Sequence, residues 1–389
     1  MWIAREAENL IMQYAKEFSA VIVTGVRQAG KTSILTRLFP QAEYVSLDNP
    51  LKALQAENSP QEFLASLGNP AIIDEIQYAP SLFRYLKLFI DREKQKGMYL
   101  LTGSQQFSLM QNVAESLAGR CGVINLSTLS ASEIDGSHKN IPMESLILKG
   151  GYPELWAGEG IQPAHWFSSY LATYLERDIR NVLRVMNLRD FNLFLKALAL
   201  RTAQTLSLSD LARDIGTAPN TIKAWLSVLE ASGQIYLLQP YYRNAGKRLV
   251  KSPKIYFRDI GLVVYLMGLN SWKEIRESFY AGAIWENFIF TQIYKKLSNS
   301  GESAINLWFW RTNIGDEVDF VIEKGGRFTA IECKLTETPT EKDLKGLNSL
   351  KKYYGESSIK DAYLACKVSE DFKMNSGITV SNFRKIDFL

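Results

Sequence analysis

The first third of the chain alternates short apolar runs with stretches of helical spacing. Four runs of mostly β-branched or large apolar residues are typical of buried strands: residues 20–23, 43–48, 71–75 and 98–104. Three stretches repeat their apolar residues as one face of a helix does: 1–18, 33–39 and 83–89. Strands that alternate with helices in this way favour an α/β fold built on a parallel sheet.

From about residue 137 the pattern becomes helical, notably at 166–175 and 190–199. The stretch 207–230 predicts a helix-turn-helix: Ser207 or Ser209 caps the first helix, Gly216 ends it, and Asn220 or Thr221 starts the second. Strands expected at 235–238 and 255–257 complete a winged-helix pattern. We therefore expect three regions in this order: a sheet domain over 1–136, a helical lid or linker over 137–190, and a winged-helix domain over 191–270.

A further unit is expected over 271–389. It begins with a helix at 283–290 and continues with three strands, 307–311, 317–323 and 329–334. The amphipathic tail from residue 342 is expected to complete the sheet and helices of this unit. The fold class predicted for the whole chain is α/β, with a parallel-sheet domain, a helical and winged-helix region and a C-terminal α/β domain.

The loop between the first strand and the next helix carries candidate chemistry. Residues 25–32 fit the P-loop pattern G-x-x-x-x-G-K-[ST] at every fixed position. In such a loop the backbone N–H groups and the helix dipole attract a phosphate. Lys31 would reach the β- and γ-phosphates of ATP, and the Thr32 hydroxyl would bind Mg²⁺. The candidate ATP contacts are Gly25, Val26, Arg27, Gln28, Ala29, Gly30, Lys31, Thr32 and Ser33.

Two later strand ends add polar groups to this site. The strand at 71–75 ends in Asp74 and Glu75, the Walker B form, in which Asp74 would hold Mg²⁺ and Glu75 would orient or activate water. The strand at 98–104 ends in Ser104, which either senses the γ-phosphate or forms an ordinary turn. We therefore predict Lys31, Glu75 and Ser104 as catalytic residues.

Composition limits the remaining classes of function. The 389 residues, 46% of them hydrophobic, suit about two to four globular domains, and the net charge of +4 means that any nucleic-acid surface is local. The two histidines nearly exclude histidine triads, and the three separated cysteines argue for a reducing compartment and against zinc or disulfides. Without a transmembrane-length apolar run or a signal-peptide pattern, we expect a cytoplasmic protein with no membrane partner.

Together these motifs resemble the P-loop ATPases of the AAA-type superfamily, in the bacterial and archaeal group with G-x-R-Q-x-G-K-T. Further matches lie at 117–120, 150–154 and 251–259. The resemblance implies a homo-oligomer with nucleotide at subunit contacts. No clear sensor-2 arginine motif is found, so Arg120 is the candidate transition-state arginine, acting in cis or from a neighbour. The alternative is an arginine that pairs structurally with Glu115 or Glu133.

Basic residues gather in and near the predicted wing, beside Tyr241 and Tyr242, and suit a nucleic-acid backbone. The candidate contacts are Lys223, Arg243, Lys247, Arg248, Lys251 and Lys254. With only Lys223 on the second helix, sequence-specific reading of a groove is disfavoured. The alternative is a winged helix that packs between subunits. The charges at 176–180 predict either a subunit-contact or lid region or, as the favoured account, a solvated helix face.

The C-terminal unit resembles the restriction-endonuclease-like PD-(D/E)xK fold. Asp319, Glu332 and Lys334 fit its D…E-x-K pattern, and Glu286 lies on the preceding helix. Glu332 and Lys334 are two residues apart on a strand and share a face. The carboxylates would hold Mg²⁺, and Lys334 would position water or neutralise charge. A strand hairpin with a surface Glu/Lys pair would give the same pattern.

These observations favour a Mg²⁺-dependent ATP hydrolase that couples nucleotide turnover to binding or remodelling of nucleic acid, with DNA favoured. Two alternatives stay open: a nucleotide-dependent regulatory switch or scaffold with an inert C-terminal domain, and an ATP-gated, metal-dependent nuclease.

Overall fold

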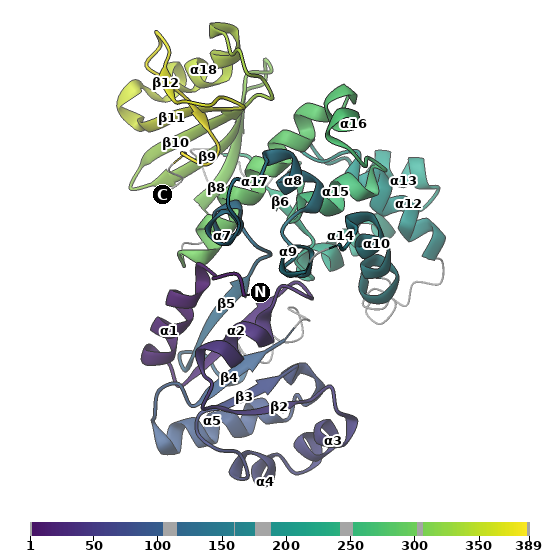
Figure 1. Cartoon of the computed structure of the whole chain (residues 1–389), viewed down its shortest axis with the longest axis vertical. Coiled ribbons are helices and arrows are strands. Elements are labelled where there is room, and N and C mark those ends of the chain that lie inside the picture. Colours follow the sequence, from purple (N-terminus) through teal and green to yellow (C-terminus); the bar gives the residue numbers. More distant parts are fainter. Residues whose placement is uncertain are drawn as a thin grey trace.

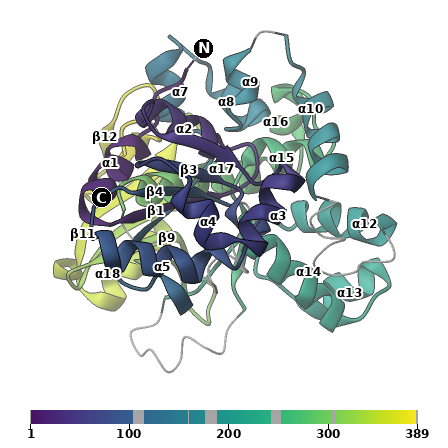
Figure 2. The ribbon, with the colours of Figure 1, turned by 90° about the horizontal axis from the view of Figure 1, so that it is seen from below.

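The computed structural model describes residues 2–103, 115–158, 160–175, 188–241, 252–301 and 306–386. A parallel sheet lies at one end of the molecule, a group of helices in the middle, and a second sheet at the other end (Figure 1). Seen from below, α12–α14 extend to one side while the C-terminal sheet lies behind the parallel sheet and toward the opposite side (Figure 2).

The N-terminal sheet is parallel, with strand order β2-β3-β4-β1-β5. Its strands are β1 (Ala20–Gly25), β2 (Glu43–Ser46), β3 (Ala71–Asp74), β4 (Tyr99–Thr102) and β5 (Cys121–Leu126). Its helices are α1 (Ala7–Glu17), α2 (Lys31–Leu38), α3 (Pro50–Asn58), α4 (Pro60–Ala65) and α5 (Leu82–Glu93). The expected parallel α/β sheet is therefore present.

Alternation along β1 explains how both faces of this sheet are covered. Val21 and Val23 lie in one apolar cluster with residues of α1 and α2, whereas Ala20 and Ile22 lie in another with residues of α4 and α5. All six residues of β1 are buried. Successive side chains of a strand point to opposite faces, so a continuous apolar run is what a strand between two helical layers requires.

The middle of the chain is mainly helical. Its elements are α7 (Ala131–Ser137), α8 (Met143–Lys149), α9 (Glu154–Ala157), α10 (Pro163–Tyr170), a π-helical turn (Leu171–Leu175), α12 (Leu188–Ala199), α13 (Leu208–Ile215), α14 (Pro219–Ala231), β6 (Ile235–Leu238), β7 (Lys254–Phe257), α15 (Ile260–Leu266) and α16 (Trp272–Glu277). Ser207 caps α13 and Gly216 ends it in the left-handed region, as expected. The second helix begins earlier than expected, at Pro219, because proline suits the first helical position.

The C-terminal sheet has the order β12-β13-β11-β10-β9-β8. It contains β8 (Leu307–Arg311), β9 (Glu317–Lys324), β10 (Arg327–Cys333), β11 (Ile359–Cys366), β12 (Phe372–Lys373) and β13 (Thr379–Asn382), with α18 (Lys345–Tyr354) against β9 and β10. β8, β9 and β10 are antiparallel, and β11 adds to β10 in parallel. The tail thus completes this sheet.

One long buried helix, α17 (Ala281–Asn299), joins all three parts. Gln292 accepts a hydrogen bond from the Ala131 backbone, Asn287 bonds both backbone polar groups of Phe257 in β7, and the Trp285 indole donates to the carbonyl of Ala365 in β11. Since each contact is buried, the three parts share one interior. Among the described helices, none is both long enough and apolar enough to cross a bilayer.

Candidate nucleotide site and a second acidic centre

The glycine loop follows β1 and leads directly into α2. Gly25 has φ of +137°, and a Cβ there would lie 2.2 Å from the carbonyl oxygen of Leu126, so only glycine fits against β5. Gly30, at φ of +90°, is the N-cap of α2. The loop therefore turns sharply at both ends and directs the start of a helix at the space where a phosphate would bind.

Lys31 is buried inside this loop. Its ammonium donates to the carbonyl oxygens of Gly25 and Val26, at 3.2 and 3.0 Å. The lysine is thus held within the loop, where it can exchange these carbonyls for phosphate oxygens. Of the other predicted contacts, Val26 and Ala29 are buried, Arg27 is half-buried, and Gln28 and Ser33 are exposed.

Asp74, at the end of β3, gathers hydroxyl groups from three other elements. The hydroxyls of Thr32 and Thr102 both donate to its Oδ1 at 2.6 Å, and the Tyr44 hydroxyl donates to Oδ2 at 3.1 Å. Burial, together with the Asp74 carboxylate, raises the pKa of Tyr44. The predicted metal-binding pair Thr32 and Asp74 therefore meets, and its hard oxygen ligands suit Mg²⁺.

Glu75 lies at the strand end in a left-handed conformation, with φ of 56°. Its backbone N–H donates to the Thr102 hydroxyl at 3.1 Å, and its carboxylate accepts a hydrogen bond from the Gln77 amide. Non-glycine residues rarely adopt this backbone region, so the contact with Thr102 holds Glu75 in a particular direction. Ser104, the other predicted catalytic residue at a strand end, lies outside the described residues.

Arg120 does not belong to this chain's own site. It precedes β5, and its carbonyl accepts from Ala20 at the start of β1, so it lies at the amino edge of the sheet, whereas the glycine loop follows the carboxyl edge. Its guanidinium makes two hydrogen bonds to Asp91, at 2.6 and 2.9 Å. The prediction of a cis role is therefore wrong, and the partner is neither Glu115 nor Glu133.

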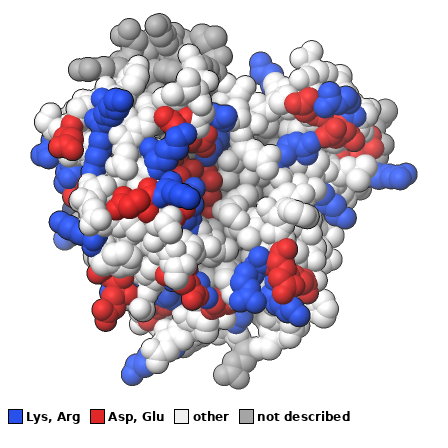
Figure 3. Space-filling model, turned by 90° about the horizontal axis from the view of Figure 1, so that it is seen from above, with Lys and Arg blue, Asp and Glu red and all other residues white. Residues whose placement is uncertain are grey.

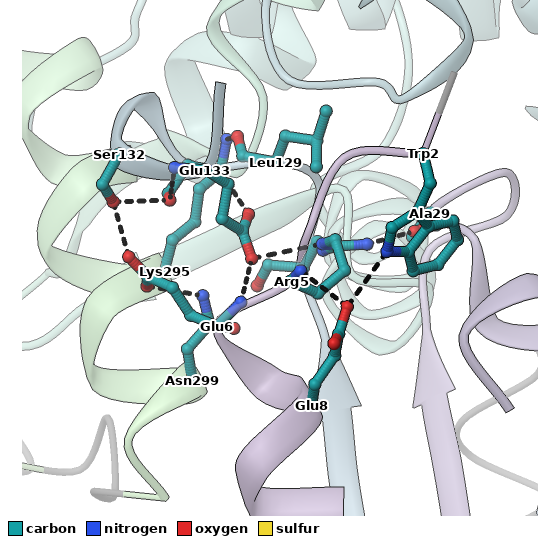
Figure 4. A network of polar contacts seen from close by, with 12 residues as sticks. Trp2, Arg5, Glu6, Glu8, Ala29, Leu129, Ser132, Glu133, Lys295 and Asn299 are labelled. Atoms are coloured by element: carbon teal, nitrogen blue, oxygen red, sulfur yellow. Dashed lines mark hydrogen bonds and ion pairs between the residues drawn. The ribbon is translucent and has the colours of Figure 1, made fainter. Parts of the chain in front are cut away.

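Glu133 instead pairs with Arg5 in a buried network behind the glycine loop (Figure 4). The Arg5 guanidinium contacts Glu133 at 3.2 Å, the Ala29 carbonyl at 2.8 Å and the Ser127 carbonyl at 2.6 Å. Lys295 of α17 donates to the Leu129 carbonyl at 2.8 Å, and burial lowers its pKa to about 8. This network ties the N-terminal segment and α17 to the loop, and the sequence pattern gave no signal for it.

Arg258 and Asp259 lie near Val26 of the glycine loop and contact the chain that follows β5. Arg258 is 7% exposed and donates to Asn125 at 3.1 Å and to the Ser127 hydroxyl at 3.3 Å, beside a small cavity lined by Val26. Asp259 accepts from the Thr128 hydroxyl and the Gly151 backbone, both at 2.9 Å. The motif match at 251–259 therefore marks a joint between the parallel sheet and the following domain.

A second acidic centre lies between α17, β9 and β10. Asp319, Glu332 and Lys334 come together as predicted: Lys334 pairs with Glu332 at 2.9 Å, and the Cys333 backbone donates to Asp319 at 2.8 Å. Glu286 also belongs to this centre. Burial and then the Asp319 carboxylate raise the pKa of Glu286 to about 7, which Lys254 only partly offsets.

The prediction that Lys254 contacts nucleic acid is wrong, because this side chain is buried. It is 3% exposed, and its ammonium lies 2.8 Å from Glu286, 3.4 Å from Asp319 and in contact with Glu317. Burial alone would lower its pKa, but these carboxylates outweigh burial and raise it. Glu317 was missed by sequence reasoning, although its position two residues before Asp319 on one strand puts both on the same face.

Among the other predicted nucleic-acid contacts, Lys223 is exposed on α14. Arg243, Lys247, Arg248 and Lys251 lie outside the described residues, as do the charges at 176–180. On the face seen from the C-terminal end, basic side chains are interspersed with acidic ones (Figure 3). A nucleic-acid contact on that face would therefore be local.

Three family profiles match consecutive parts of the chain: an AAA domain over 17–135 and two domains of unknown function, DUF8612 over 142–273 and DUF4143 over 281–386. The uncharacterized proteins Rv2008c of Mycobacterium tuberculosis and Mb2031c of Mycobacterium bovis are each 31% identical over 339 residues, covering 86% of this chain and 75% of the relative. The chain belongs to the family of these two proteins. Its N-terminal part is an AAA-type, ATPase-like P-loop domain.

Solved structures with similarity to this AAA-domain protein include a Walker-type ATPase of Pyrococcus abyssi, with a TM-score of 0.44, 16% identity and coverage of 68% of this chain and 96% of that one. AMPPCP-bound DnaA from Aquifex aeolicus has a TM-score of 0.33 and 14% identity, and the match covers 59% of this chain and 89% of that one.

Proposed function

We propose that this AAA-domain protein is a Mg²⁺-dependent ATP hydrolase. The observation that carries the proposal is the 2.6 Å contact between the Thr32 hydroxyl and the Asp74 carboxylate, beside a glycine loop that holds Lys31. When bound, Mg²⁺ would supply charge neutralisation at the phosphates. Lys31 would bind the β- and γ-phosphates, and Glu75 would orient the attacking water and accept its proton.

Steady-state ATP turnover of Lys31→Ala and Glu75→Gln tests this proposal. Lys31→Ala is expected to lose nucleotide binding, whereas Glu75→Gln is expected to bind ATP and lose about 10²- to 10⁴-fold in turnover, the usual contribution of a general base. Glu93→Gln, an exposed carboxylate on α5, is the matched control. Parental turnover by Glu75→Gln would refute the role given to Glu75.

We also propose a homo-oligomer, with Arg120 supplied to the site of a neighbouring copy. Arg120 is one-third exposed and lies away from its own loop, which leaves it accessible to another chain. Turnover per chain should then rise with protein concentration, and Arg120→Ala should abolish that rise. A monomer with concentration-independent turnover would remove this proposal.

We further propose that ATP turnover is coupled to nucleic acid, with DNA favoured. Exposed Lys223 on the second helix of the helix-turn-helix supports this, together with the basic residues between β6 and β7 in the sequence. Single-stranded, duplex or branched DNA should raise ATP turnover, and binding should weaken steeply with salt. Replacing Lys223, Lys247 and Arg248 with glutamine should reduce both effects. An ATPase that DNA does not stimulate would argue against coupling.

A regulatory switch is the second candidate, and the joint formed by Arg258 and Asp259 supports it. Arg258 and Asp259 contact Ser127 and Thr128 near Val26 of the glycine loop. A movement of the loop on nucleotide binding would therefore reach the helical region through few residues. Small-angle scattering with ADP and with a non-hydrolysable ATP analogue should then differ without DNA. Identical curves would exclude a switch of this kind.

A further inference from the structure

The acidic centre contains a lysine at the position where a metal ion would be expected. Carboxylates of Glu286, Glu317 and Asp319 converge on the Lys254 ammonium from α17 and β9. Crowded carboxylates repel one another unless a cation lies among them. The Lys254 ammonium is such a cation, so these three carboxylates do not need a metal ion to lie close together.

The present geometry also does not suit a metal. Within the described part of the chain, no three His, Cys, Asp or Glu side chains are grouped so that they could hold an ion. The donor set is nevertheless appropriate for a divalent cation, because it consists of carboxylate oxygens. The ligands are therefore of the right chemical type for a divalent cation, but their arrangement is not suitable for one. The Lys254 ammonium lies among three of these carboxylates, where the cation would bind.

One buried oxygen points to a ligand. Glu332 is 7% exposed, and its Oε2 atom has no hydrogen-bond partner, while Oε1 is paired with Lys334. Close packing of α18 shapes this position: a Cβ on Gly346 would lie 1.8 Å from the Glu317 carbonyl and 3.3 Å from Glu332 Oε2. A buried carboxylate oxygen without a partner is costly, so this oxygen would serve as a further ligand for a cation that replaced Lys254.

We propose that Lys254 is an internal cation that closes a divalent-cation site formed by Glu286, Glu317, Asp319 and Glu332, so that Lys254 and the metal exclude each other. The wild-type centre binds no divalent cation while Lys254 is in place. When Lys254 is absent, the four carboxylates take up Mg²⁺ or Mn²⁺. This inference is independent of ATP hydrolysis, because it concerns residues of α17, β7, β9 and β10 alone.

Mn²⁺ binding and thermal unfolding of the full, nucleotide-free chain test the proposal. Lys254→Met should bind about one additional Mn²⁺, and millimolar Mn²⁺ should raise its melting temperature by roughly several degrees. The wild type should show neither effect. Lys345→Met, which removes an exposed lysine paired with Asp316 and changes the net charge equally, is the matched control and should resemble the wild type.

With the single variants, either of two results would overturn the proposal: an unchanged melting temperature and no added Mn²⁺ in Lys254→Met, or Mn²⁺ binding by the wild type that Asp319→Asn abolishes. If Lys254→Met folds only with Mn²⁺, the proposal is supported. Should it not fold in either condition, the double variant Lys254→Met/Glu286→Gln restores the charge balance and keeps three carboxylates. The absence of a Mn²⁺-dependent shift in that background also overturns the proposal.

Discussion

Replacing Arg5 with methionine tests whether the buried network behind the glycine loop stabilises the nucleotide site (Figure 4). The Arg5 and Glu133 side chains are only 3% and 1% exposed. Methionine keeps much of the apolar volume of arginine but removes its donors to Glu133, Ala29 and Ser127. The substitution therefore leaves a carboxylate and two carbonyl oxygens without this partner.

Removing one partner of a buried ion pair costs about 3–5 kcal/mol. Glu133 keeps two other donors, the backbone N–H groups of Glu6 at 2.8 Å and Ser130 at 2.7 Å. These bonds continue to stabilise its charge, so we expect about 3 kcal/mol, the low end of that range. Loss of the Ala29 bond alone, about 1 kcal/mol, should also weaken ATP binding about fivefold, since Ala29 belongs to the loop.

Equilibrium urea unfolding and binding of a fluorescent ATP analogue would measure the two effects. In a double-mutant cycle with Glu133→Met, the two substitutions should show a coupling of about 2 kcal/mol, because the double variant no longer buries an unpaired charge. Arg92→Met, at an exposed ion pair, is the control and should change stability by less than about 0.5 kcal/mol. Additive single effects, or unchanged ATP affinity in Arg5→Met, would refute this reasoning.

Three further predictions concern the loop, the joint and α17. Gly25→Ala should greatly weaken ATP binding, because its Cβ would overlap the Leu126 carbonyl; isothermal titration with parental affinity would contradict this. Arg258→Ala should leave ATP binding intact but remove any ATP-dependent change in protease sensitivity of residues 200–270, whereas Arg201→Ala should preserve that change. Lys295 has a folded-state pKa of about 8, below the unfolded value of 10.5, so the unfolded state binds the proton more tightly. The free energy of unfolding of the wild type, relative to that of Lys295→Met, should therefore rise between about pH 8 and 10.5. If the difference between the two proteins does not change over this range, Lys295 is not buried in its neutral form.

The parallel sheet and its loop could be predicted from the sequence because their signals are local. The first four residues of β1 are apolar because both faces of the strand are covered, and the glycine pattern begins at its last residue. Thr32 and Asp74 were predicted as a pair because the P-loop pattern and the two acids that end a later strand are both local sequence signals. The strand β5 was not predicted, and only its presence in the structure places Arg120 at the opposite edge of the sheet.

The contacts between domains could not be predicted in the same way. Lys254 lies in a stretch that reads as a basic wing, and its burial is decided by Glu286, Glu317 and Asp319, which come from α17 and β9. Arg5 likewise finds Glu133 across the fold. A charge pattern gives the net character of a segment, whereas the partner of each charge depends on tertiary packing.

β7 connects the acidic centre with the end of β5, which pairs with β1 beside the glycine loop. Lys254 and Tyr256 both bond Glu286, while Arg258, two residues further, contacts Asn125 and Ser127 at the end of β5. At about 3.3 Å per residue, the Cα atoms of Lys254 and Arg258 are separated by roughly 13 Å of extended chain. Asn287 of α17 bonds both backbone polar groups of Phe257, so this strand cannot slide without breaking buried hydrogen bonds. A shift of Arg258 must therefore either move Lys254 and α17 together or be absorbed at the joint, and only the first would connect the loop with the C-terminal carboxylates.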